Sequence, residues 1–295
     1  MPGDLSGCGV SIAAKISDRI SNFATIAVAA SGEEECDGGG WLTNALNTAV
    51  SGGAVSIGTM SLDQFSNRAQ AHASFLRYSF QSLIRSASVA NPSVGDCKVQ
   101  VYAGNHLPLD PYGPDSIDAG RYLVLTRPDG SQITMGGPPI YVYPYLGFLM
   151  LGQYSIRETG SESGIGAFTA NIDIPPSFSG ELDWTNASAI SSISRASDLT
   201  VRWTTPATQG LVYVNGVTAQ AAPARLNGSF LCVATAAAGS FTVPSYVLSA
   251  IPANSAGLGS LTISYELTEP DFSAEGLTAG LASISTSVSK QVDFR

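Results

Sequence analysis

The chain of 295 residues contains few charged side chains, which make up 13% of the sequence compared with about 25% in typical soluble domains. Lysine and arginine together number 14, against 23 acidic residues, and the formal net charge is −9. No run of basic residues could follow a nucleic-acid backbone. We therefore expect no nucleic-acid partner, and a surface covered by Ser, Thr, Asn, Gln and Gly.

Long apolar runs are also missing. No segment reaches the roughly 20 apolar residues of a membrane-spanning helix, and the longest candidate, Ile140–Leu151, is interrupted by Pro144 and Gly147. The sequence shows no charged segment succeeded by an apolar one, the pattern of a secretory signal. Low charge with polar strands still favours a secreted or cell-surface protein, and we expect its signal to have been removed or to lie upstream.

Cysteine is scarce, and its spacing excludes the usual zinc sites. The four cysteines are Cys8, Cys36, Cys97 and Cys232, and no pair has the CxxC spacing of a zinc ligand set. An even number favours two disulfides in an oxidising compartment. Spacing alone leaves three pairings open. We favour Cys8–Cys36, which would fasten the opening hairpin to the next segment of the chain, with Cys97–Cys232; four free buried thiols are the alternative.

Alternation of apolar and polar residues recurs along the chain, whereas helical periodicity is nearly absent. Segments such as Phe168–Ile174 and Leu261–Leu267 would bury one face and expose the other, as antiparallel sandwich strands do. Asp129-Gly130, after Tyr122–Thr126, and Asn215-Gly216, after Leu211–Val214, predict tight hairpin turns, because these residues tolerate positive φ. The sequence therefore predicts an all-β fold, an antiparallel β-sandwich of immunoglobulin-like type.

Two short segments depart from this simple pattern. Phe75–Ile84 fits both helical and strand spacing, and we favour a strand because the residues before it also alternate. A short helical turn is expected near Pro244–Leu248, since proline suits the start of a helix.

Linkers suggest how the chain is divided. Val10–Ile16 and Phe23–Val28 predict a β-hairpin that looks like the end of a domain whose earlier strands are missing. The acidic, glycine-rich Ser31–Gly40 comes after it, and Pro175–Gly180 interrupts the later strands. We expect a terminal hairpin and linker at 1–35, a first β lobe at 36–176 and a second, β-sandwich lobe at 177–295.

Several segments resemble a known group of proteins. Asp198–Thr204 (DLTVRWT), Gly228–Ala234 (GSFLCVA) and Ala238–Pro252 resemble a block in large secreted proteins of soil bacteria, of acidobacterial type and of unknown function. Gly164–Ile174 resembles the segment that precedes this block. The opening, with Ser21–Ala29, is similar to the final strands of TIG/IPT-type immunoglobulin-like domains. The resemblance implies a secreted β-sandwich at the C-terminal region of such a protein, and it carries over no catalytic residues.

The motifs do not define a catalytic site. Ala54–Gly58 comes nearest to a nucleophile elbow but lacks the first glycine of GxSxG, and we interpret the two histidines, His72 and His106, as ordinary surface or loop residues. Acidic residues are numerous, but no spacing selects a glycosidase pair. The candidates are Asp110, Asp115, Asp118, Glu158, Glu162, Asp173, Glu181 and Asp183.

Calcium and carbohydrate are the ligands that the sequence leaves open. Asp110, Asp115 and Asp118 supply oxygen atoms suited to calcium, although without EF-hand spacing, and a plain structured loop is the alternative. Tyr141, Tyr143 and Tyr145 would share one face of a regular strand, which could bind a glycan or simply pack on the sheet. Pro144 between them indicates an edge strand or a loop.

The sequence thus favours a non-catalytic extracellular or cell-surface module for adhesion, display or self-assembly, without a cofactor. A carbohydrate-binding module is the first alternative and an unrecognised secreted hydrolase the second. The unpaired edges of the opening hairpin also predict addition of a strand to another sheet, in the same chain or in a neighbouring copy. Expected partners are other copies of the chain, another cell-surface protein or a glycan.

Overall fold

The computed structural model describes residues 7–12, 15–16, 19–20, 24–28, 53–66, 68–79, 82, 91–103, 113–138, 140–160, 164–178, 182–207, 209–222, 226–254 and 256–295. Up to residue 28 the description covers the backbone alone.

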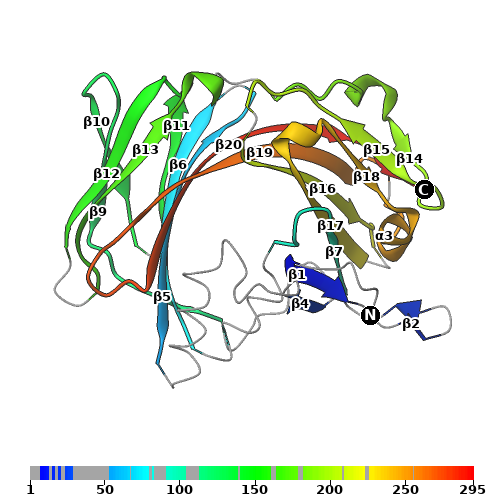
Figure 1. Ribbon diagram of the computed structural model, residues 1–295, viewed down its shortest axis with the longest axis horizontal. Helices are drawn as coiled ribbons and strands as arrows, with labels where there is room; N and C mark the ends of the chain where they lie inside the picture. Colours follow the sequence, from blue (N-terminus) through cyan, green and yellow to red (C-terminus); the bar gives the residue numbers. More distant parts are fainter. Residues whose placement is uncertain are drawn as a thin grey trace.

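One large sheet of 13 strands dominates the described chain (Figure 1), and every pairing in it is antiparallel except that of β5 with β20. The predicted all-β, sandwich-like fold is therefore confirmed. From one end to the other the strands are β13 (Gly166–Ile174), β12 (Gly152–Gly160), β9 (Tyr122–Thr126), β10 (Gln132–Gly136), β11 (Ile140–Gly147), β6 (Ala69–Tyr78), β5 (Val55–Gln64), β20 (Ala279–Gln291), β19 (Gly259–Phe272), β16 (Leu211–Ala219), β17 (Leu226–Thr235) and β7 (Cys97–Ala103), with β8 (Asp115–Ser116) paired to β6.

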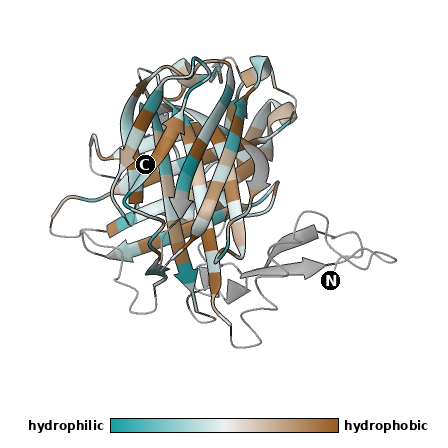
Figure 2. Cartoon of the chain, turned by 90° about the vertical axis from the view of Figure 1, so that its left-hand side faces the viewer, coloured by the Kyte–Doolittle hydropathy of each residue, from teal (hydrophilic) through white to brown (hydrophobic). Residues whose placement is uncertain are grey.

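Alternating burial explains why these segments are strands. Along β13, Phe168, Ala170, Ile172 and Ile174 are buried while the residues between them are exposed, and the same alternation of hydrophobic and hydrophilic residues is visible along neighbouring strands (Figure 2). A strand with this pattern can cover a core with one face and meet water with the other. The strand predicted from Phe75 is confirmed as far as Tyr78, where β6 ends.

At one end the sheet folds back over its own apolar face; we call β13, β12, β9, β10, β11 and β6 the curled end. The first strand, β13, packs on β19, which lies far along the same sheet. The Phe168 ring of β13 lies 5.4 Å from that of Phe272 and 5.6 Å from that of Phe75. The N–H of Gly166 also donates a hydrogen bond to the Glu275 carbonyl at 2.8 Å. Aromatic packing and backbone bonds thus close this end.

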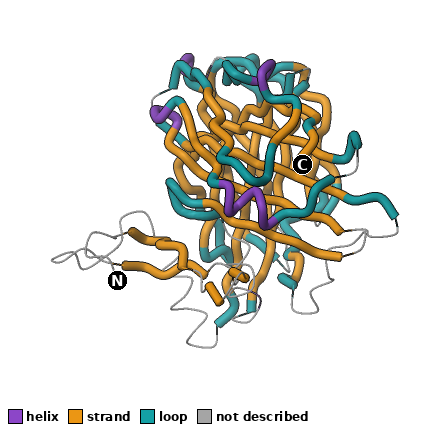
Figure 3. The backbone as a smooth tube through the Cα atoms, turned by 90° about the vertical axis from the view of Figure 1, so that its right-hand side faces the viewer, coloured by secondary structure: helices purple, strands orange, loops and turns teal. Residues whose placement is uncertain are grey.

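At the other end a layer of short elements covers the same apolar face; we call β16, β17 and β7 with this layer the stapled end. The layer consists of the pair β15 (Leu199–Arg202) and β18 (Ser240–Val243), the parallel pair β14 (Ser192–Ile193) and β21 (Asp293–Phe294), and helix α3 (Ser245–Ala250). Figure 3 shows α3 over the strands at this end. The helical turn expected beside Pro244 is confirmed, because α3 begins at the next residue.

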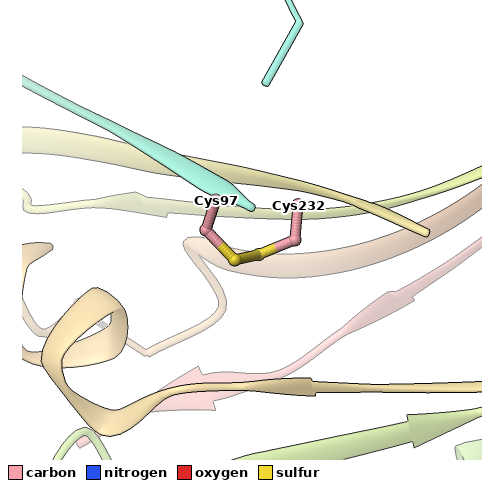
Figure 4. The surroundings of a disulfide bond; sticks show 2 residues. All are labelled: Cys97 and Cys232. Carbon is pink, nitrogen blue, oxygen red and sulfur yellow. A yellow bond between two sulfur atoms is a disulfide. The ribbon is translucent and has the colours of Figure 1, made fainter. Parts of the chain in front are cut away.

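A disulfide fastens the last strand of the sheet. Cys97 on β7 and Cys232 on β17 face each other in the register and are bonded, with an S–S length of 2.02 Å (Figure 4). This favoured pairing is confirmed. The second predicted disulfide, Cys8–Cys36, lies outside the described residues, because Cys36 is not described and Cys8 is described only in its backbone.

The two predicted turns have different outcomes. Asp129-Gly130 lies between β9 and β10, with Gly130 at φ +82° and Arg127 and Ser131 joined by a backbone hydrogen bond, so this hairpin is confirmed. The turn at Asn215-Gly216 is wrong, because both residues lie in the middle of β16. Gly216 is needed there for space: a Cβ at this position would overlap the ring of Phe230 on β17.

The opening segment forms the expected hairpin. Strand β1 (Gly7–Ile12) pairs antiparallel with β4 (Ala24–Val28), and the short β2 (Lys15–Ile16) and β3 (Arg19–Ile20) pair between them. The predicted division into two lobes between residues 176 and 177 stays a prediction. Strands of the two predicted lobes are paired in one sheet, since β7 pairs with β17 and β5 pairs with β20. Among the described residues, helices long and apolar enough to cross a membrane do not occur.

Candidate binding site between two hairpin tips

A cavity of about 410 Å³ opens beside the curled end; we call it the tip cavity. It lies between the β5–β6 and β11–β12 connections and is closed by the end of β13, by the short helix η1 (Pro176–Phe178) and by β20. None of its lining residues has a titratable side chain. They are Gln64, Phe65, Ser66, Phe148, Leu149, Leu151, Ile174, Phe178, Thr286, Ser287 and Val288.

Gln64 joins the two connections that form the cavity. Its side-chain oxygen accepts a hydrogen bond from the N–H of Leu149 at 2.9 Å. Its amide nitrogen donates to the carbonyls of Phe65 at 2.7 Å and Arg68 at 3.1 Å. The residue is only 8% exposed, and bonds of this kind are strengthened in a low-dielectric environment. The tip cavity is therefore held open by the fold itself and does not need a ligand to form.

Thr286 is the polar residue that lies deepest in the wall. Its side chain is 5% exposed, and it occupies a core-facing position of β20, in line with Ala282 and Ile284. In the described part of the chain no hydrogen bond of its hydroxyl group is found. Among the described residues Arg195 Nε is the one sealed side-chain atom without a partner, so the Thr286 hydroxyl is not sealed off but opens onto the cavity, where a molecule can reach it.

Large apolar side chains surround the mouth. Phe148 is 66% exposed and Leu151 is also exposed. Tyr145, three residues before Phe148, is 70% exposed. Exposed aromatic residues grouped in this way are typical of recognition surfaces.

The predicted tyrosine row is not a continuous exposed surface, because Tyr141 packs in the core, the alternative that the sequence left open; ligand binding by these residues stays a prediction. Tyr141 is completely buried, its hydroxyl donates to the Gly120 carbonyl at 2.6 Å, and its ring meets Phe75 edge-on at 5.9 Å. Tyr143 is half-buried and packs on the core. The register shifts between Tyr143 and Gly147, so Tyr145 alone of the three is strongly exposed. The curl converts one face of β11 into core.

The other predicted site residues do not come together. Asp115 lies exposed on β8, and Asp118 is exposed and accepts a bond from the Gly120 N–H at 2.8 Å; Asp110 lies outside the described residues. Within the described ranges, groups of three or more side chains that could hold a metal ion are absent. The calcium site therefore stays a prediction.

The residues weighed for hydrolysis are also placed. Ser56 sits within β5, a regular strand that continues to Gln64, and its own N–H donates to the Thr278 hydroxyl at 3.1 Å. A nucleophile elbow needs a sharp strand-to-helix turn at the serine, which this position lacks. His72 lies half-buried on β6 opposite Ser61, and His106 is outside the described residues.

A row of polar side chains crosses the opposite face of the central strands. Asp63 accepts hydrogen bonds from the hydroxyls of Ser285 at 2.8 Å and Ser61 at 3.0 Å. Glu266 faces Ser285 from β19, and burial, with the charge of Asp63 adding to it, raises the pKa of the Glu266 carboxyl. Nearby, burial raises the pKa of Tyr213 to about 12. Glu266 can therefore keep a proton at a pH where an ordinary glutamate has lost it.

Sequence reasoning missed Gln64 and Thr286, the residues that define the tip cavity. Both interrupt an apolar series on the core face of a strand: Met60 and Leu62 precede Gln64, and Ile284 precedes Thr286. A polar residue at a position that alternation assigns to the core is a usable signal. It indicates a buried hydrogen bond or a site.

Comparison with known proteins places the chain in no established family. No family model matches the sequence, and no curated protein matches it. A crystal structure of a DUF4785 family protein from Legionella pneumophila is similar at 8% sequence identity, over 79% of this chain and 54% of that one, with a TM-score of 0.25. The chain thus spans about half the length of that protein. A likeness this distant carries no argument about function.

Proposed function

We propose that the protein is a non-catalytic module of an extracellular or cell-surface protein and that it acts by binding through the tip cavity. The observation that carries the proposal is the chemistry of the cavity wall, which is apolar with a few hydroxyl and amide groups and holds no titratable side chain. Acid–base and nucleophilic catalysis require such side chains at the site. A preformed apolar pocket with a few polar groups is typical of binding.

The extracellular location is supported by the disulfide and by the surface. Cross-links such as Cys97–Cys232 persist in oxidising compartments. The exposed faces of the central strands carry more serine and threonine than charged residues, for example Thr262 bonded to Ser289 at 2.9 Å. The immunoglobulin-like character and the TIG/IPT-like origin of the opening hairpin belong to the same proposal, supported by the antiparallel pairing of β1 with β4.

A screen for turnover tests the non-catalytic part of the proposal. The full chain is assayed against broad sets of ester and glycoside substrates, beside the His72→Ala and His106→Ala variants. We expect no turnover above the buffer rate. Turnover that either substitution abolishes would overturn the proposal.

Carbohydrate binding is the second candidate, favoured by the exposed rings of Tyr145 and Phe148. Aromatic faces of this kind can stack on sugar rings. A glycan array tests this candidate. It is probed with the wild-type chain, with Phe148→Ala and, as a control, with Tyr122→Ala. Tyr122 is a suitable control because its exposed ring on β9 stacks with Arg121. Binding lost only in Phe148→Ala supports a glycan ligand. No binding to any glycan rejects it.

Self-assembly by strand addition is the form of display that the topology favours. The β1–β4 hairpin makes a two-stranded sheet of its own, and β7 ends the large sheet in the described part of the chain. A lone hairpin is marginally stable in water, and an open strand edge is a template for pairing. Light scattering of the full chain and of a chain without residues 1–35 tests this. Association in the full chain alone is expected, and monomers in both would contradict it.

A further inference from the structure

We infer that the tip cavity binds an uncharged, mostly apolar small molecule that carries one hydrogen-bonding oxygen, and that the Thr286 hydroxyl is the partner of that oxygen. This inference rests on the proposed binding function and adds the chemical class of the ligand. It is carried by three features of the cavity: its size, the absence of charge in its wall and the placement of Thr286.

The size and shape fit a small molecule. A volume of about 410 Å³ lies within the range of roughly 300–1,000 Å³ found for ligand pockets. Phe65 and Leu149 line the cavity from the two hairpin connections, and Ile174 and Phe178 from the end of β13 and from η1. Phe178 is itself supported by Tyr265, with ring centroids 5.7 Å apart. These walls contact the apolar body of a ligand and release water from it.

The wall excludes a charged group. None of the lining side chains carries a charge, so an ion inside would lose its hydration without gaining a partner in the wall. The Arg68 guanidinium lies 5.6 Å from the centroid of the Phe65 ring, but it is exposed to solvent and is not part of the wall. The acidic row of Asp63 and Glu266 projects from the opposite face of the sheet, because both residues alternate with core-facing neighbours on their strands. Neither carboxylate can therefore neutralise a cation in the cavity.

Thr286 supplies the buried polar contact, whereas the other two hydroxyl residues of the wall, Ser66 and Ser287, are exposed and half-buried respectively. The amide of Gln64 already makes three hydrogen bonds within the protein, so it has little left to offer a ligand. Thr286 is buried, lines the cavity and has no hydrogen bond from its hydroxyl in the described residues. A ligand that displaces water from the cavity must replace the hydrogen bond that water gives this hydroxyl, and a ligand oxygen does so whereas a hydrocarbon does not.

Three ligands with one shared ring system test the inference: 2-naphthol, naphthalene and 2-naphthoate. Their affinities for the full chain are measured by fluorescence titration at neutral pH, where 2-naphthol is uncharged and 2-naphthoate is an anion. We expect 2-naphthol to bind about fivefold more tightly than naphthalene, the effect of one net hydrogen bond. The anion should bind at least about tenfold more weakly than 2-naphthol because its charge is not solvated in the cavity.

Variants locate the effect. Thr286→Val keeps the shape and removes the hydroxyl, so it should abolish the preference for 2-naphthol over naphthalene. Val288→Phe fills the cavity and should abolish binding of all three ligands. Val217→Phe is the matched control, on an exposed position of β16, and should change nothing. If Val288→Phe fails to fold, Leu151→Trp at the exposed mouth takes its place.

The outcomes separate this inference from the proposed function. Equal binding of 2-naphthoate and 2-naphthol, or a preference for 2-naphthol that survives Thr286→Val, overturns the ligand class. Absence of binding by all three ligands, while the wild-type chain binds a glycan at Phe148, overturns the inference and leaves the binding function standing. Catalytic turnover overturns the proposed function whatever the three ligands do.

Discussion

The curled end and the stapled end cover the same apolar sheet face by different means. At the curled end the sheet covers itself, with Phe168 of β13 seated between Phe75 and Phe272. At the stapled end short elements form the cover, fixed by side-chain bonds to the backbone such as Trp203 to the Ala236 carbonyl at 3.0 Å. A disulfide then holds the last strand.

The difference shows what a long strand can do that a short element cannot. A strand such as β13 presents several apolar side chains in a row to the opposite strands, so burial supplies most of its hold there. Strands β14 and β21 have two residues each and bury one large side chain each, Ile193 and Phe294, so directional bonds add more to the hold of this layer. Asn186 illustrates this, because its side chain bonds the Trp184 ring N–H, the Arg202 N–H and the Thr200 carbonyl.

Truncating the centre of the curl should have the largest effect on stability. Phe168→Ala removes a buried ring from between two others and should cost about 3–5 kcal/mol of unfolding free energy. Because β5, β20 and β19 join both ends in one sheet, tryptophan fluorescence and far-UV circular dichroism should shift together in urea. Trp184 and Trp203 report on the stapled end. A dichroism transition that precedes the tryptophan one would show that the two ends unfold separately.

Removing the staple should have the next largest effect. The disulfide joins residues separated by 135 positions, and replacing both partners by alanine should cost about 2–4 kcal/mol, mainly by freeing the unfolded chain. Thermal denaturation of Cys97→Ala/Cys232→Ala, with and without reductant, measures this. Reductant should lower the Tm of the wild type more than that of the variant. Equal effects of reductant on both would assign the stabilisation elsewhere.

Crowding the glycine on β16 should have an intermediate effect confined to the stapled end. In Gly216→Ala the new methyl group overlaps the Phe230 ring, and overpacking of this kind costs about 1–3 kcal/mol. Gly136→Ala is the control, since a Cβ there meets no atom within 4 Å. Phe230→Leu in the Gly216→Ala background should recover part of the loss. Destabilisation by Gly136→Ala as large as by Gly216→Ala would contradict the steric explanation.

The smallest effect on stability is expected from a change at Glu266, which lies on β19, one of the strands that join the two ends. Burial raises the pKa of Glu266 in the folded state above its ordinary value of 4.5, so the folded protein binds this proton more tightly than the unfolded one. Stability should therefore fall as the pH rises from 4.5 through the raised value. Glu266→Gln should be more stable than the wild type at neutral pH and lose that advantage at low pH.

Chemical denaturation across this pH range measures the effect, with Glu275→Gln at an exposed position as the control. An advantage of Glu266→Gln that does not change with pH would show that the buried proton is not its cause.

Particular residues show how far sequence reasoning reached. Alternation located β6 and β13, the proline located α3, and Asp129-Gly130 located a hairpin. Asn215-Gly216 has the same turn chemistry but lies inside β16, because the neighbouring Phe230 ring needs the space at Gly216. The local sequence pattern cannot distinguish a glycine that is needed for a positive φ angle from one that is needed because a neighbouring side chain occupies the space of its Cβ.

The candidate site could not be predicted from the local sequence pattern for a related reason. Tyr141, Tyr143 and Tyr145 looked equivalent in sequence, yet the curl buries the first and a register shift exposes the last. Gln64 and Thr286 are separated by more than two hundred residues and meet only because β5 pairs parallel with β20. Such a parallel pairing leaves no turn signal in the sequence.

The sequence by itself determined the strands and the all-β class, because alternation and side-chain chemistry act over a few residues. It favoured the pairing of Cys97 with Cys232 among the alternatives, and the register of β7 on β17 decided it. Only the tertiary structure decided which apolar faces became core and which apolar side chains stayed exposed at the mouth of the tip cavity. The fold-back of β13 onto β19 and the parallel meeting of β5 and β20 create the tip cavity. These contacts depend on burial between strands distant in the chain, which no local pattern encodes.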